Sequence, residues 1–138
     1  MANSATTKNR ILMIGLHPTT VDYSRFPGLD EATFTQRIEA GNRAIDEAGF
    51  DAVSCLIGTS PDEAESTIRG QLAADSFALA MVGAGIRTLP EYTLLFERII
   101  NVLGAAAPGI QLCFNTSPET TIDALRRWVR PLGDTPQR

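Results

Sequence analysis

The only histidine of this 138-residue chain, His17, follows the first apolar run of the sequence and could act as a general base. Asp22, a few residues later, could orient its ring, and Arg87 could hold the carboxylate or phosphate of a substrate. These three residues would suit a small hydrolase or isomerase that acts on a small acid. No second histidine and no nucleophile in a turn motif accompanies them, so an ordinary loop role for His17 is the competing interpretation.

A second group of residues favours ligand binding without chemistry. Residues 15–30 form a connection much longer than the ~2–6 residues that usually join a strand to a helix, and long loops are often functional. Residues 83–87 contain two glycines, which allow a tight turn and the close approach of another group. The candidate ligand contacts are Thr19, Asp22, Tyr23, Gly83, Gly85, Arg87 and Asn115.

These candidates also have structural alternatives. The glycines could serve only close packing against the first loop, and Arg87 could form an ion pair with Asp22 or Glu91. Asn115 could cap the last helix. If Arg87 faces the ligand, we expect that ligand to be a small anion.

Several specific motifs are missing from the sequence. A dinucleotide fingerprint is not formed, because the only Gly-x-Gly pair does not follow the first strand and Thr88 stands where a third glycine is needed. A phosphate-binding Gly-Lys-Ser/Thr loop, a nucleophile elbow and the spacing of a metal site are also absent. We therefore expect neither a cofactor nor a metal.

Four short apolar runs predict strands, and each is nearly continuous rather than alternating, as in a parallel sheet covered on both faces. They span residues 10–16, 52–57, 77–82 and 110–114. Helical periodicity lies between and after them. It covers residues 34–48, 61–74, 90–106 and 122–129.

The junctions after the second, third and fourth runs share one local pattern. Residues 59–62, 88–91 and 116–119 each supply a hydroxyl for an N-cap, a proline for the first turn and an acid after it. Such junctions start a helix directly after each strand, which favours alternating β and α elements. The sequence predicts a three-layer α/β/α sandwich of the Rossmann-like, flavodoxin-like kind, with a four-stranded parallel sheet in the order 2-1-3-4. This order brings residues 17–25 and 83–87 together at one edge of the sheet.

Composition and charge limit the partners and the location. A net charge of −4 without a basic run argues against nucleic acid and anionic membranes as partners, and no apolar stretch is long enough to span a bilayer. Cys55 and Cys113 both lie in apolar runs, which suits the reducing cytoplasm. We expect one domain over residues 1–138, with 1–9 and 132–138 flexible.

Five segments of the sequence read Gly15-Leu16-His17-Pro18, Val21-Asp22-Tyr23-Ser24, Val82-Gly83-Ala84-Gly85-Ile86-Arg87, Leu95-Phe96-Glu97 with Asn101, and Phe114-Asn115-Thr116-Ser117-Pro118. These segments resemble a family of small uncharacterised bacterial proteins of unknown function. The resemblance covers most of the chain and implies a flavodoxin-like fold without an assigned activity. Members of this family often carry an aspartate at the position of His17, which argues against a general base there.

The order of elements also resembles receiver domains of response regulators. The acidic pair, the phosphate-accepting aspartate and the lysine of those domains are missing, since the corresponding places hold Leu16-His17 and Gly83-Ala84. The Asp-x-His-x-x-Gly motif of cobalamin-binding domains is not formed around His17 either. Phosphotransfer and cobalamin binding are therefore not expected.

Three hypotheses follow from these patterns. The first is a small ligand-binding or regulatory module without chemistry of its own, and the second is the enzyme that uses His17, Asp22 and Arg87. The third is a homodimeric interaction module, because the helix over residues 90–106 is apolar on more than one face.

Overall fold

The computed structural model describes residues 10–130, and these residues contain a four-stranded parallel sheet. Its strands are β1 (Ile11–Leu16), β2 (Ala52–Ile57), β3 (Leu79–Val82) and β4 (Gln111–Phe114). Their order in the sheet is β2-β1-β3-β4, so the predicted order and direction of the strands are confirmed. The flexibility expected for residues 1–9 and 132–138 concerns segments outside the described range.

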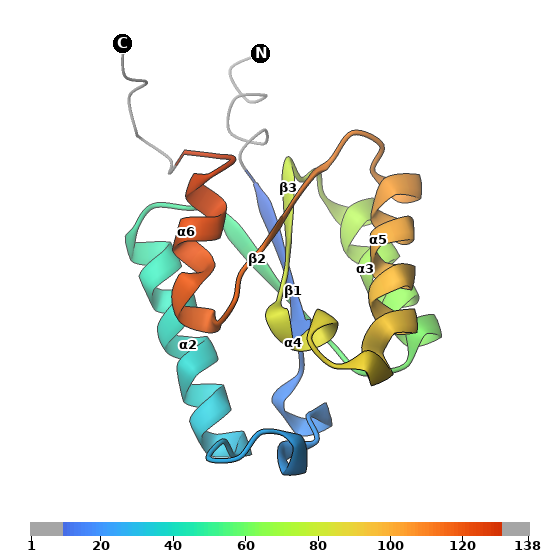
Figure 1. The fold of residues 1–138 in the computed structure, drawn as a ribbon. Helices are drawn as coiled ribbons and strands as arrows, with labels where there is room; N and C mark the ends of the chain where they lie inside the picture. The colour runs from blue at the N-terminus through green and yellow to red at the C-terminus, as the bar shows by residue number, and fades with distance from the viewer. Residues whose placement is uncertain (1–9, 131–138) are drawn as a thin grey trace.

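Helices cover both faces of this sheet and complete the predicted three-layer sandwich (Figure 1). One layer holds α2 (Glu31–Glu47) and α6 (Thr121–Arg126), and the other holds α3 (Pro61–Ala74) and α5 (Thr93–Ala106). The layers follow from right-handed crossovers, because β1 passes to β2 in one direction and the chain then returns across β1 to β3 and β4.

The two faces of the sheet carry separate hydrophobic clusters. In β1, Leu12 and Ile14 belong to the cluster under α3 and α5, whereas Ile11 and Met13 belong to the cluster under α2 and α6. All four side chains are buried. The continuous apolar runs of the sequence therefore reflect burial on both sides.

The junction motifs after β2 and β3 differ in how their hydroxyl residues are used. Ser60 caps α3 as expected, because its hydroxyl accepts the Glu63 N–H at 3.3 Å. In the motif after β3, Pro90 and Glu91 do begin the turn η3 (Pro90–Tyr92), but the hydroxyl cap was predicted wrongly. The chain first forms the short helix α4 (Ala84–Arg87), and the Thr88 N–H closes it on the Ala84 carbonyl. Thr88 thus ends one helix and does not cap the next.

Short 3-10 turns separate the last two strands from their helices, so these helices differ from the predicted ranges. The turn η3 (Pro90–Tyr92) precedes α5, and η4 (Pro118–Thr120) precedes α6. The helix expected over 122–129 ends at Arg126, where α6 gives way to a turn.

Packing of α5 explains most of the apolar residues that suggested a dimer. Its side chains Leu95, Ile99, Val102 and Leu103 are buried in the cluster shared with α3. Leu94 is 69% exposed, and one exposed leucine is ordinary for a protein surface. A homodimer through this helix stays a prediction.

The long connection after β1 has a local structure of its own. It contains the 3-10 turns η1 (Pro18–Thr20) and η2 (Tyr23–Arg25), and it ends where the Asp30 carboxylate accepts the Thr33 N–H at 2.7 Å and caps α2. This connection lies at the carboxyl edge of the sheet, below α2 in Figure 1.

The two edge strands of the sheet are protected to different degrees. At β4, Arg127 donates to the Phe114 carbonyl at 2.9 Å. Strand β2 contains no charged residue and no proline, and within residues 10–130 no side chain hydrogen-bonds to its backbone. Charged groups and proline are the usual protection of an edge strand.

Candidate functional site

Two glycines leave a trough in the sheet on the face under α2. On this face, Leu56 of β2 pairs with Gly15 of β1, and the register continued by one residue adds Gly83 after β3 and Asn115 after β4. A Cβ atom placed on Gly83 would lie only 3.8 Å from the Gly15 Cα, which confirms that the two glycines are neighbours. The two central positions of this row therefore have no side chains.

A pocket occupies the space that these glycines leave open. The cavity has a volume of about 120 Å³, is open to solvent on one side and extends beneath α2. Phe34 and Ile38 of α2 form its roof, and Leu56 forms a wall at the exposed edge strand. Most of the surface is apolar, which is typical of pockets for small organic molecules.

Polar groups gather at the end of the pocket that lies beside β4 and α6. Asn115, Ser117 and Thr121 line this end. Asn115 is only 6% exposed, and its side-chain oxygen accepts the Ala84 N–H at 2.9 Å. Its amide nitrogen donates to the Thr121 hydroxyl, also at 2.9 Å. Asn115 thus joins the start of α4 to the start of α6 and fixes the polar end of the pocket.

No charged side chain among residues 10–130 lines this pocket. An ion pair joins Arg37 of α2 to Glu119 of η4, through contacts of 2.9 and 2.7 Å. Each of these two residues is next in the sequence to a residue that lines the pocket. The Arg37 guanidinium holds the pKa of Glu119 down at about 2. This bidentate pair connects α2 to the segment that includes the pocket residue Pro118.

Arg87 lies on the other face of the sheet. Its guanidinium donates to the Asn115 carbonyl and stands 5.4 Å from the centroid of the Phe114 ring, which packs with the α3 and α5 layer. The predicted ion pair with Asp22 or Glu91 is wrong, because Glu91 pairs with Arg25 and Asp22 binds Ser24. The arginine therefore serves the backbone and the aromatic cluster, and it does not line the pocket.

His17 and Asp22 each cap a turn of the loop after β1. The His17 Nδ1 lies 2.8 Å from the Thr19 hydroxyl and accepts the Thr19 N–H at 3.2 Å. Asp22 accepts the backbone N–H and hydroxyl of Ser24 at 3.1 and 2.6 Å, and these bonds lower the pKa of its carboxyl. Within the described part of the chain, no hydrogen bond joins His17 to Asp22. Their arrangement is that of turn caps.

Three of the predicted contact residues meet at the pocket. Gly83, Gly85 and Asn115 line it, as the glycine turn suggested. The other candidates do not line it, and they are Thr19, Asp22, Tyr23 and Arg87. Tyr23 is used locally, because its hydroxyl donates to the Pro18 carbonyl at 2.6 Å and its ring meets Phe34 edge-on.

The apolar lining was missed at the sequence level. Phe34 and Ile38 fit an ordinary buried helix face, and Leu56 fits an ordinary strand. The available signal was a set of small residues within apolar segments: Gly15 in a central strand, Gly41 in the apolar stripe of α2, and Ser54 inside an apolar run. A small residue on a packed face removes volume that neighbours must fill or leave empty.

Other kinds of site find little support in residues 10–130. They contain no cluster of histidine, cysteine, aspartate and glutamate that could hold a metal ion. Cys55 and Cys113 are free and buried, and burial raises the pKa of each thiol to about 11. Over the same range, no helix has both the length and the apolar character that crossing a bilayer requires.

Comparison with known proteins finds no relative of this chain. No family model matches the chain, and neither a curated protein nor a solved structure matches it.

Proposed function

We propose that this protein is a small ligand-binding or regulatory module that holds one small molecule beneath α2 and performs no chemistry of its own. The observation that carries the proposal is the pocket above Gly15 and Gly83. It lies at the carboxyl ends of β1 and β3, where the strand order reverses. Open α/β sheets place their ligands at this position.

Packing supports a binding role for the trough. Protein interiors are close-packed, and a glycine in a central strand weakens the strand by ~0.5–1 kcal/mol relative to alanine. At Gly15, an added Cβ would meet only Leu56 Cδ2, at 3.9 Å, so an alanine fits there without a clash. Position 15 could hold a larger residue but holds glycine. This choice is explained if the volume that the glycine leaves empty is occupied by a ligand.

The enzyme hypothesis has weaker support. His17 and Asp22 bond to residues within their own turns, and Arg87 lies on the opposite face from the pocket. A reaction would need these groups around one substrate. The enzyme stays a prediction without a geometric argument in its favour.

A cytoplasmic location is part of the same proposal. Two free, buried thiols, Cys55 and Cys113, support a reducing compartment.

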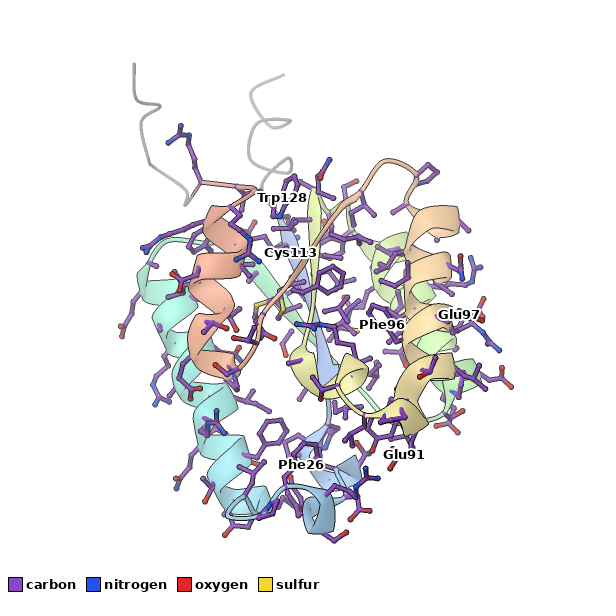
Figure 2. The ribbon with its side chains drawn as sticks, viewed as in Figure 1. Phe26, Glu91, Phe96, Glu97, Cys113 and Trp128 are labelled. Carbon is purple, nitrogen blue, oxygen red and sulfur yellow. The ribbon has the colours of Figure 1, made fainter. Side chains whose placement is uncertain are left out.

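A neutral fluorescent probe tests the pocket directly. The only tryptophan, Trp128, lies at the opposite end of the molecule from the loop that contains Phe26, so intrinsic fluorescence would report poorly on the trough (Figure 2). We would titrate the full chain into N-phenyl-1-naphthylamine, whose emission rises in an apolar site. We expect saturable binding to the wild type.

Two variants locate the bound probe. Gly15→Val fills the trough and should abolish the emission increase, while circular dichroism shows that the protein is still folded. Leu94→Ala removes an exposed side chain from the far layer and should bind the probe like the wild type. Equal binding to wild type and Gly15→Val, or no saturable binding at all, would refute the proposed function.

A further inference from the structure

We infer that the ligand of this pocket is a neutral, largely apolar molecule with one hydrogen-bond acceptor at its end, an inference that rests on the proposed function. The class follows from three features of the site. They are the uncharged lining, the commitments of three nearby arginines, and the polar end that Asn115, Ser117 and Thr121 form.

The lining alone disfavours an ion. An ion that leaves water for an apolar site loses several kcal/mol of hydration unless an opposite charge or several hydrogen bonds replace it. The walls consist mainly of apolar side chains such as Phe34, Ile38 and Leu56, with glycine backbone between them. The uncharged side chains of Asn42 and Ser54 also belong to this lining. Nothing in this part of the pocket compensates a charge.

Three arginines of the neighbouring elements are already engaged. Arg37 makes the bidentate pair with Glu119, and Arg25 is paired with Glu91. Arg87 is held against Phe114 and the Asn115 carbonyl on the other face. An anionic ligand would have to break one of these contacts before it gained any of these three cations. Arg43 of α2 lines a neighbouring hollow and does not line this pocket.

The polar end fits one acceptor atom. The Asn115 amide carries two N–H groups, and its hydrogen bonds within the described residues account for one of them, to Thr121. Asn115 lines the pocket and is only 6% exposed, so water does not readily reach its side chain. Its second N–H is therefore a donor that a carbonyl or ether oxygen of a ligand would satisfy. A ligand with its acceptor at this end places its apolar body between α2 and the glycines.

Three naphthalene probes of similar size separate these features. They are 2-acetylnaphthalene, which is a neutral acceptor, 2-naphthoate, which is an anionic acceptor, and 2-ethylnaphthalene, which has no acceptor. Each would compete with N-phenyl-1-naphthylamine at pH 7 for the full chain. We expect the ketone to compete best, the carboxylate at least tenfold more weakly, and the hydrocarbon severalfold more weakly than the ketone.

A charge placed at the pocket provides the reciprocal test. Ser54 lines the pocket and is exposed, so Ser54→Arg adds the missing cation with little effect on folding. It should improve the carboxylate relative to the ketone, whereas Ser54→Gln, similar in length but neutral, should leave the order unchanged.

The results of these experiments distinguish a wrong ligand class from a failure of the proposed binding function. If naphthoate competes as well as the ketone in a trough that Gly15→Val still closes, the pocket binds ligands but the neutral class is wrong. If the hydrocarbon equals the ketone, the acceptor at Asn115 is wrong. If no probe binds in a way that depends on Gly15, the proposed function itself fails.

Discussion

Replacement of Gly15 by valine should make the protein more stable, although it changes a residue in the middle of the sheet. Gly15 has a negative φ, unlike Gly28, Gly49 and Gly109, so a side chain requires no change of backbone conformation. Its added Cβ would be in ordinary contact, 3.9 Å from Leu56 Cδ2, and would face the trough.

The expected gain comes from two contributions. Removing glycine from a strand contributes ~0.5–1 kcal/mol, mainly by restricting the unfolded chain. The two further methyl groups of valine would each contribute ~0.8 kcal/mol if fully buried, and about half of that in a trough that is open at one side. The sum is about 1.5 kcal/mol, which corresponds to a rise in Tm of roughly 6 °C for a chain of this size.

Urea unfolding followed by circular dichroism would measure this gain, with Gly15→Ala as an intermediate step of about 0.5–1 kcal/mol. Gly83→Val is the matched control from the same row. An added Cβ there lies 3.4 Å from the Ile14 carbonyl oxygen, at the lower limit of ordinary contact, so valine has less room than at Gly15 and should stabilise the fold less. A loss of stability in Gly15→Val would show that the trough does not have the free space assigned to it.

Three further predictions concern groups around the site. Asn115→Ala should cost ~2–4 kcal/mol in urea unfolding, because it removes two buried hydrogen bonds and leaves the Ala84 N–H without its acceptor. A cost below 0.5 kcal/mol would contradict the role of this side chain as a link. The lowered pKa of Glu119 means that its pair with Arg37 stabilises the fold above pH ~4.5 and loses this effect as the pH falls toward 2. Since both side chains are more than a third exposed, the double-mutant coupling at pH 7 should be at most ~1 kcal/mol and should shrink toward zero at pH 2. Cys55 and Cys113 should not react with a disulfide reagent at pH 8 in the native state and should both react in guanidinium, because burial raises the pKa of each thiol to about 11. Fast labelling of the native protein would contradict this burial.

The sheet was predictable because its signals are local. Four apolar runs and the hydroxyl-proline junctions are each contained in a few consecutive residues, and the capping role of Ser60 follows from its own tetrapeptide. The junction at Thr88 failed because the same chemistry can end a helix as well as begin one, and the glycine turn before it folds into α4.

The candidate site was less predictable because it depends on register. Gly15 and Gly83 are far apart in the sequence, and only the pairing of β1 with β3 places them side by side. The direction of the Arg87 side chain could not be predicted either, because it depends on which face of the sheet each residue at the end of β4 points to. The side chains of Phe114 and Asn115 point to opposite faces of the sheet, and the arginine is held by the ring on one face rather than by the polar group on the other.

The unequal edges of the sheet determine how it could grow. A strand that approached β4 from outside would first have to displace the Arg127 guanidinium from the Phe114 carbonyl. An approach to β2 would meet amide groups to which no side chain of residues 10–130 is bonded, together with the partly exposed side chain of Leu56. Any extension of this sheet by another polypeptide would therefore begin at β2, beside the mouth of the pocket, and the same encounter would cover Leu56 and alter access to the trough.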